Sequence, residues 1–177
     1  MKNFSSIMMT AWRSFRKMIN DNKQHYLFPC MIFCSREEFQ VTTVLGSCIS
    51  VCLYDPVTKI GGINHYMLAL WNGIGLESPK YGNIAITKLL EKMLELGSRK
   101  NNLHAKVFGG AKVLEATQNS SINVGERNIE IAMDMLSEEH IPVVASSMGD
   151  LFGLKIIFNT VTGEILMKRV RRCKYEK

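Results

Sequence analysis

No stretch of this sequence stays apolar for the roughly 18 to 20 residues that a membrane-spanning helix needs. A secretory signal pattern is also lacking, because charged and polar residues interrupt every apolar run before Asn20. The sequence contains no nucleic-acid recognition motif, no nucleotide-binding P-loop pattern, no internal repeat and no low-complexity segment. These absences predict a cytoplasmic protein that does not bind nucleic acid.

The five cysteines are an odd number and indicate no disulfide framework, which favours a reducing compartment. Cys30 and Cys34 share a three-residue spacer with Cys48 and Cys52, and such a pair of pairs can signal a four-thiolate zinc site. We expect no metal, because residues 48–52 are predicted as an extended strand that holds the two thiols too far apart to chelate easily.

The net charge of +6 is concentrated at the two ends of the chain. Residues 1–24 carry five basic residues against one acidic residue (+4), and residues 168–177 carry six against one (+5), which leaves −3 for the middle. Within residues 1–24, Met8, Trp12, Phe15 and Ile19 recur at helical spacing among basic residues. We expect a basic amphipathic or flexible extension over 1–24 that makes peripheral contact with a membrane or a partner, two solvated ends being the alternative.

Residues 25–177 have the length of one domain, with strands and helices predicted from apolar periodicity. Strands are predicted over 39–44, 49–54, 63–70, 103–108, 141–145, 155–159 and 164–170, the last two joined as a hairpin. Helices are predicted over 83–96, capped by Asn83 and ended by Gly97, and over 123–139. Gly109 and Gly110 predict a tight turn, and 71–81 a loop. Grouped strands with two inserted helices indicate an α+β fold with a mixed or largely antiparallel sheet.

Cys48 and His65 are the candidate catalytic residues. Cys48 follows a turn formed by Gly46 and Ser47, whose backbone N–H groups are candidates for an oxyanion hole. A thiol needs a nearby imidazole to become a thiolate at neutral pH, and two consecutive strands that pair antiparallel would bring His65 close to Cys48. Each residue alone is more often structural, since free cysteine and strand histidine are usually buried packing residues.

The sequence segments around Cys48 and His65 make their assignment more specific. Residues 42–48 (Thr-Thr-Val-Leu-Gly-Ser-Cys) and 61–68 (Gly-Gly-Ile-Asn-His-Tyr-Met-Leu) resemble the CheD family of chemoreceptor glutamine deamidases, as do 106–111, 124–128 and 162–169 in the same order. The resemblance implies that Cys48 is the nucleophile, His65 the base and Thr42 the residue that completes the site, with no cofactor. It implies a β-sandwich-like core flanked by helices, similar to cytotoxic necrotizing factor deamidases, and binding of methyl-accepting chemoreceptors and of a CheC-type phosphatase.

Some positions depart from the family pattern, and none of them is a predicted catalytic residue. They are Cys30, Ala69, Ser147, Asp150 and Leu154. Two alternatives to receptor deamidation stay open at this stage. The domain could act mainly as a partner and regulator of a CheC-type phosphatase, or it could be a cysteine hydrolase of another protein amide or ester, since the thioester route differs only in its leaving group.

Overall fold

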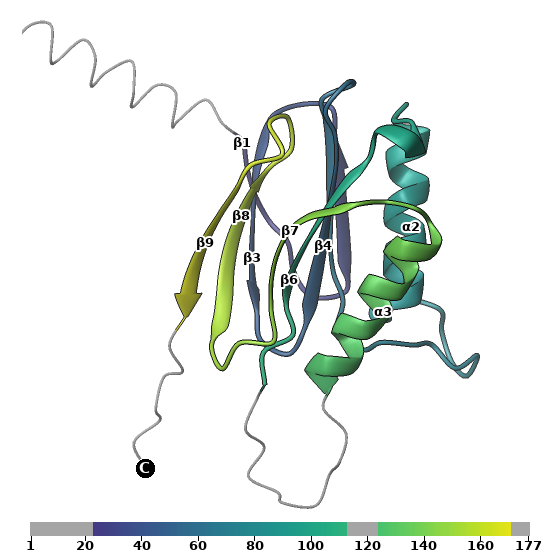
Figure 1. The fold of residues 1–177 in the computed structure, drawn as a ribbon, viewed down its shortest axis with the longest axis vertical. Helices are drawn as coiled ribbons and strands as arrows, with labels where there is room; N and C mark the ends of the chain where they lie inside the picture. Colours follow the sequence, from purple (N-terminus) through teal and green to yellow (C-terminus); the bar gives the residue numbers. More distant parts are fainter. Residues whose placement is uncertain (1–22, 113–123, 171–177) are drawn as a thin grey trace, which may run out of the picture.

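The computed structural model describes residues 23–112 and 124–170, which form two β-sheets and two α-helices (Figure 1). The four-stranded sheet has the order β1-β3-β8-β9, and the five-stranded sheet has the order β2-β5-β4-β6-β7. Two strand pairs, β1 with β3 and β6 with β7, are parallel, and the others are antiparallel. The described elements are β1 (Lys23–Tyr26), β2 (Met31–Ser35), β3 (Phe39–Leu45), β4 (Ile49–Asp55), β5 (Ile60–His65), α2 (Gly82–Glu95), the 3₁₀ helix η1 (Lys100–Asn102), β6 (His104–Gly109), α3 (Val124–Glu138), β7 (Val143–Met148), β8 (Gly153–Asn159) and β9 (Ile165–Val170).

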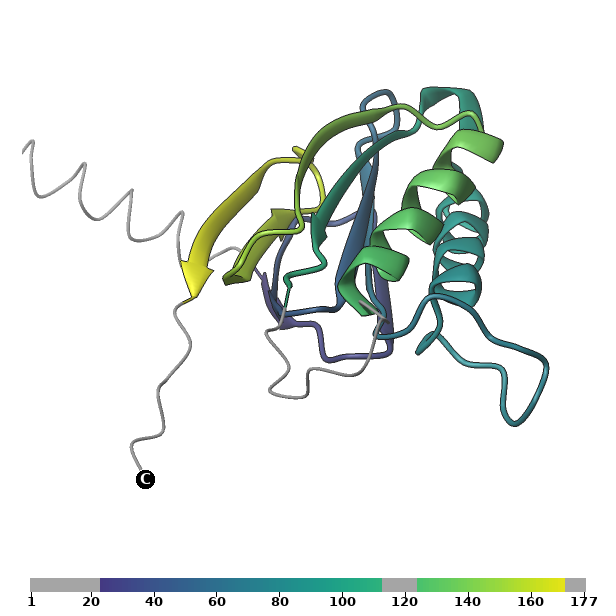
Figure 2. The ribbon, with the colours of Figure 1, turned by 60° about the horizontal axis from the view of Figure 1, so that its bottom comes forward.

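The two sheets face each other, and both α-helices lie on the outer side of the five-stranded sheet (Figures 1 and 2). This arrangement creates two apolar cores. One lies between the helices and the five-stranded sheet, and the other lies between the two sheets. The predicted α+β class with a mixed sheet and outer helices is therefore confirmed.

Strand β4 is buried on both of its faces, which explains its nearly continuous apolar sequence. Ile49, Val51 and Leu53 pack into the core beneath the helices. Cys48 and Cys52 belong to the core between the sheets. Side chains alternate between the two faces of a strand, so neighbouring residues of β4 point into different cores.

Strand β5 begins three residues earlier than predicted, because Gly61 and Gly62 lie within it rather than before it. A Cβ on Gly61 would lie 2.4 Å from the carbonyl oxygen of Thr160, and one on Gly62 would lie 2.7 Å from Cys34 Sγ. The two glycines thus let β5 approach the opposite sheet on one side and the helix layer on the other.

The predicted start of the first helix is corrected at one residue. Helix α2 begins after Tyr81, and no side chain caps it. Asn83 instead accepts a hydrogen bond from the backbone N–H of Trp71 through Oδ1 at 3.0 Å, which ties down the predicted loop 71–81. Gly97 ends the helix with φ +95°, as predicted.

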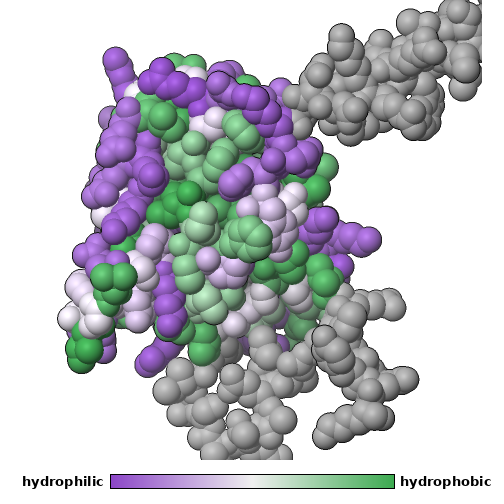
Figure 3. Space-filling view, turned by 180° about the vertical axis from the view of Figure 1, so that it is seen from behind, coloured by the Kyte–Doolittle hydropathy of each residue, from purple (hydrophilic) through white to green (hydrophobic). Residues whose placement is uncertain are grey.

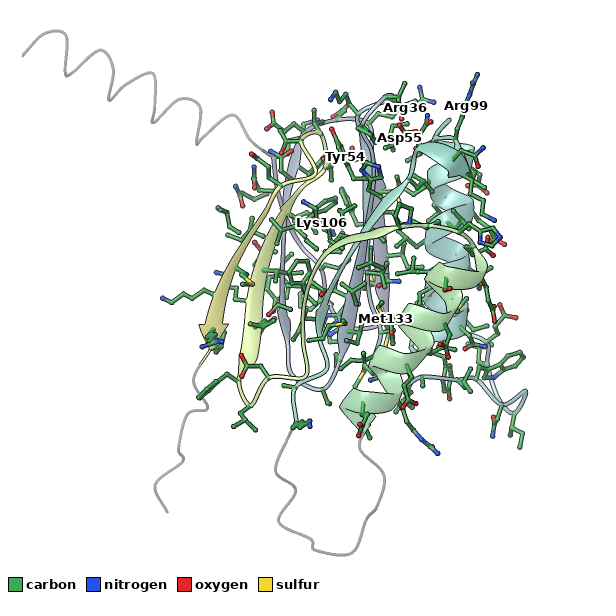
Figure 4. All side chains as sticks on the ribbon, in the orientation of Figure 1. Arg36, Tyr54, Asp55, Arg99, Lys106 and Met133 are labelled. Carbon is green, nitrogen blue, oxygen red and sulfur yellow. The ribbon has the colours of Figure 1, made fainter. Side chains whose placement is uncertain are left out.

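Polar contacts join the sheets at the end near the β8–β9 turn. The Tyr54 hydroxyl donates to the Val161 carbonyl at 2.7 Å, and Lys106 Nζ donates to the Gly163 carbonyl at 2.8 Å. Figure 4 shows both side chains reaching from the five-stranded sheet toward the opposite one. The connection between β3 and β4, which carries the predicted nucleophile, lies at the other end of the strands.

The predicted amphipathic pattern within residues 1–24 lies outside the described residues, except that Lys23 and Gln24 begin β1. Residue 123, the predicted start of the second helix, is also outside them. In the described ranges 23–112 and 124–170, neither α-helix has the length and apolar content that a bilayer crossing requires.

Candidate active site

Cys48 lies at the end of the turn between β3 and β4, and the turn is held by three backbone carbonyls. Ala111 N–H donates to the Gly46 carbonyl, and Gly110 N–H donates to the Cys48 carbonyl, both at 2.8 Å. The Ser47 carbonyl accepts a hydrogen bond from Asn128 Nδ2 at 3.0 Å. The position of the half-buried Cys48 is therefore fixed from both β6 and α3.

Gly109, at the end of β6, is the closest neighbour of this turn. It has φ +110°, and a Cβ there would lie 2.2 Å from the Cys48 carbonyl oxygen. Only glycine meets both conditions without strain. The predicted turn at Gly109 and Gly110 therefore has a second role, because it holds Cys48 in place.

His65 is the last residue of β5 and is only 2 % exposed. Its Nδ1 atom lies 2.8 Å from the Thr43 hydroxyl oxygen, and that hydroxyl donates to the Leu27 carbonyl at 2.8 Å. A hydroxyl has one hydrogen, so in the His65 contact Thr43 accepts and Nδ1–H donates. The resulting tautomer leaves a lone pair on Nε2, the arrangement that a general base requires.

The Nε2 atom of His65 is buried and has no hydrogen-bond partner among the described residues. Burial lowers the pKa of His65 to about 4, with the Leu27 carbonyl acting in the opposite direction. The imidazole is therefore neutral at pH 7. A neutral, unpaired ring nitrogen inside the sandwich is chemically ready to accept a proton.

Cys48 and His65 emerge from the same face of adjacent strands, as predicted. The antiparallel ladder pairs Cys52 with Ile63, and its register continues to a bridge between Ile49 and Tyr66. This register places Cys48 two residues diagonally from His65, and such neighbours are about 7 Å apart at the backbone, within reach of long side chains. Both residues face the core between the sheets.

Burial raises the pKa of the Cys48 thiol, and the nearby Cys30 thiol raises it further, while the backbone N–H of Cys48 lowers it. The resting pair is therefore a neutral thiol and a neutral imidazole. Cys30 is also close to the His65 strand, since its N–H donates to the His65 carbonyl at 2.7 Å.

Thr42, the residue predicted to complete the site, does not contact His65. The side chains of Val41, Thr43 and Leu45 are buried, while Thr42 alternates with them and is paired with Tyr26 and Ile157 on the other face of the four-stranded sheet. The structure brings Thr43, rather than Thr42, to His65. The sequence Thr42-Thr43 offers two hydroxyls, and the register of β3 selects between them.

Asn128 on α3 is a site residue that the sequence analysis did not single out. It is fully buried, and its Nδ2 donates to the Met67 carbonyl at 2.9 Å as well as to Ser47. One amide thus joins the nucleophile turn to the segment that follows His65. The only sequence signal for it is its place in the block 124–128, in which Gly125 also lets α3 approach Gly110 closely.

A cavity of about 500 Å³ lies next to Asn128, between α3 and the segment Leu68–Leu70. Its α3 side includes Arg127 and Asp134, and Asn128 is shared with the nucleophile turn. Ala69, one of the positions that depart from the family pattern, lines the cavity. Cys48 does not line this cavity, which is connected to the Cys48 turn only through Asn128.

The titration of His65 predicts how stability depends on pH. Its pKa is near 6.5 when unfolded and about 4 when folded, so between these values the unfolded chain binds more protons and acid favours unfolding. We expect the free energy of unfolding to fall by roughly 3 kcal/mol from this residue alone as the pH drops from 6.5 to 4. Denaturant unfolding at both pH values measures it. A His65→Gln variant with the same acid dependence as wild type would contradict the assignment.

Residues 71–169 match a family model described as CheD chemotactic sensory transduction. A protein of Trichlorobacter lovleyi, named a probable chemoreceptor glutamine deamidase CheD, is 52 % identical over 147 residues, which cover 83 % of this chain and 91 % of the relative. A protein of the same name from Sulfurimonas denitrificans is 42 % identical over 153 residues, 86 % of this chain and 98 % of the relative.

The level of these matches decides the classification. The family model spans more than half of the chain, and both relatives exceed the identity and coverage at which homology is secure. Cys48 is held by contacts between the β3–β4 turn and residues as far along the chain as Asn128. This region lies within the part of the chain aligned with the relatives, and Asn128 also lies within the match to the family model. This chain therefore belongs to the CheD family.

Proposed function

We propose that this protein deamidates glutamine side chains of methyl-accepting chemoreceptors, converting each to glutamate with release of ammonia. The relatives named probable chemoreceptor glutamine deamidases support the reaction and the substrate. The observation that carries the proposal for this chain is the chain of contacts from the Leu27 carbonyl through Thr43 to His65, which orients an unpaired imidazole nitrogen on the face that also carries Cys48.

In the proposed mechanism, Cys48 attacks the carboxamide carbon as His65 Nε2 takes the thiol proton. The backbone N–H groups of Gly46 and Ser47 are the donors that we propose for the developing oxyanion, and hydrogen bonds to the carbonyls of the turn, from residues after β6 and from α3, hold it in place. His65 then gives the proton to the leaving nitrogen, and ammonia departs. Water, deprotonated by His65, hydrolyses the thioester to glutamate and restores the thiol.

The neutral resting pair suits this sequence of proton transfers. With a histidine pKa of about 4 and a raised cysteine pKa, a standing thiolate–imidazolium pair is disfavoured. The proton therefore moves only when the substrate carbonyl is in place to accept the sulfur. Thr43 acts as a positioning residue, because it touches His65 and not the substrate.

Exposed apolar side chains lie near His65 in the sequence and in the sheet. Phe28, Met31 and Met67 are all more than a third exposed, although each is close in sequence or strand register to His65. Such side chains, together with the cavity beside Asn128, supply a contact surface for a protein substrate rather than for a free amino acid. A complex with a CheC-type phosphatase stays a prediction, which co-purification of the two proteins would test.

The decisive comparison is between the two adjacent threonines. A soluble receptor fragment is incubated with each variant, and mass spectrometry measures the gain of about one dalton at each deamidated glutamine. We expect Thr43→Val to lower kcat about 10- to 100-fold with little change in KM, because His65 loses its orientation. We expect Thr42→Val to keep wild-type activity. The reverse ranking would return the role to Thr42, and equal activity of both would remove the relay through Thr43.

The pH profile separates a positioning role from general loss of structure. With Thr43 in place, the acidic limb of kcat/KM reports the titration of His65 in the free enzyme. We expect Thr43→Val to shift that limb, and Thr43→Ser, which keeps the hydroxyl, to restore both the limb and most of the rate.

A further inference from the structure

The four-stranded sheet has an outer face that neither described helix covers (Figures 1 and 2). Strand alternation and the ladder register place one row of side chains across all four strands on this face: Tyr26, Thr42, Ile157 and Leu166. Tyr26 is 47 % exposed and Leu166 is 69 % exposed. The face therefore presents apolar side chains to the outside in an ordered row.

The charges on this sheet all have one sign. Its strands contain Lys23, Lys155, Lys168 and Arg169, and none of the four strands contains aspartate or glutamate. The five-stranded sheet differs, since it contains both Asp55 and Lys106. Lys23 is ion-paired with Glu37 and Arg169 with Asp150, so Lys155 and Lys168 are the basic residues of this sheet that have no ion pair with a described residue.

Two of the lysines form an unfavourable pair. Lys155 and Lys168 lie directly opposite each other on β8 and β9, on the same outer face as Leu166. Like charges at directly opposed positions destabilise a sheet. Neither lysine has an ion pair with another described residue. An arrangement that places two positive charges together without a counter-charge is explained if an external anion neutralises them.

The basic ends of the chain join this same sheet. Residues 1–22 lead into β1, and residues 171–177 follow β9, so the two ends connect to its two edge strands. Each end carries four basic residues against one acidic residue, a net charge of +3. Positive charge in the sequence is therefore concentrated in the segments that precede β1 and follow β9.

We propose that the outer face of the β1-β3-β8-β9 sheet docks on an anionic phospholipid bilayer. Lysines around exposed tyrosine and aliphatic side chains are the composition of a surface that inserts shallowly between headgroups while its charges contact phosphates. Figure 3, which views the molecule from behind, shows apolar side chains gathered in the middle of that face with polar side chains around them. The Cys48 turn lies at the end of the strands, so docking by this face leaves the active site accessible.

Sedimentation of the full chain with phospholipid vesicles tests the proposal without any receptor. Wild type is expected to bind vesicles of phosphatidylcholine mixed with phosphatidylglycerol at about 0.1 M salt, and to bind pure phosphatidylcholine weakly. Each surface lysine contributes about fivefold to such binding, so Lys155→Gln/Lys168→Gln is expected to lower it about 25-fold with both basic ends intact. Leu166→Gln is expected to lower it about tenfold.

The matched control removes the same charge from the opposite side of the molecule. Lys92 on α2 and Arg99 just after it belong to the helix layer, and Figure 4 shows Arg99 on that side. The Lys92→Gln/Arg99→Gln variant is expected to bind within about twofold of wild type, since it lies beyond the screening length of roughly 10 Å. Unfolding temperatures and deamidation of a soluble fragment are measured in parallel. Deamidation is expected to be unchanged in both double variants, and the unfolding temperature to be unchanged in the control and no lower than wild type in Lys155→Gln/Lys168→Gln, which removes a like-charge pair.

Several results would overturn the proposal. Equal vesicle binding by wild type and by Lys155→Gln/Lys168→Gln would assign the affinity to the chain ends alone. An equal loss in the control variant would reduce the effect to net charge. Wild type that ignores anionic vesicles but binds polyglutamate through these lysines would replace the lipid with an acidic protein partner. None of these outcomes affects the deamidase proposal, which is measured on a soluble substrate.

Discussion

Replacing Cys48 with alanine is expected to lower deamidation of a receptor fragment by about 10⁴-fold or more, because the proposed thioester forms on its sulfur. The loss should appear in kcat, while binding of the fragment is retained. Mass spectrometry of the substrate glutamines measures the rate, and tryptic digestion of wild type quenched during turnover should capture Cys48 as the acylated residue.

Cys34→Ala is the matched control for this experiment. Cys34 is also partly buried, but it packs against the core beneath the helices, where burial raises its pKa to about 12. We expect this variant to keep its rate at temperatures where it is folded. Deamidation by Cys48→Ala at the wild-type rate would end the nucleophile assignment, and an equal loss in Cys34→Ala would indicate a general effect of removing buried thiols.

Gly109→Ala is expected to destabilise the protein by about 3 to 5 kcal/mol and to abolish activity. The estimate combines a left-handed backbone conformation, which costs about 1 to 3 kcal/mol for a residue with a Cβ, with overpacking of similar size. The added methyl would press on the Cys48 carbonyl, so the part of the protein that moves is the nucleophile itself. Denaturant unfolding and the deamidation assay measure the two effects.

Gly46→Ala provides the control from the same turn. A Cβ at Gly46 meets nothing within 4 Å, so we expect its stability to stay within about 1 kcal/mol of wild type and its activity to be unchanged. If Gly46→Ala were the more damaging change, the contact between Gly109 and the turn would not be what positions Cys48. The pair of variants therefore compares two glycines that the sequence alone presents as similar turn residues.

Local patterns were sufficient to predict the central hairpin. The apolar run of β4 and the polar break after Asp55 indicated a strand and its end, and the antiparallel return of β5 placed His65 on the face of Cys48. The short edge strands β1 and β2 were not predicted. Their four and five residues are separated by Cys30, which has φ +65°, and such short segments carry too little periodicity to be distinguished from a loop.

Residues that depend on distant pairing were beyond the reach of the sequence. Choosing between Thr42 and Thr43 required the register of β3 against β8, and finding Asn128 required knowing that α3 packs across the end of β4 and β5. Asn83 shows the opposite error, because a residue type typical of a helix cap is used to hold a loop. In each case the local sequence allowed more than one role for the residue, and a contact with a distant part of the chain determined which role it has.

The adjacent glycines of β5 also limit how His65 can move. If β5 shifted by two residues, the Ile63 side chain would occupy the position of Gly61, where even a Cβ would clash with the Thr160 backbone. If it shifted by one residue, the imidazole of His65 would point toward the helices. Steric crowding at Gly61 thus fixes the register of β5, and with it the position of His65 along the strand. Any conformational change that accompanies substrate capture must then come from elements other than β5 and the fixed Cys48 turn, such as the exposed residues 72–77 of the loop.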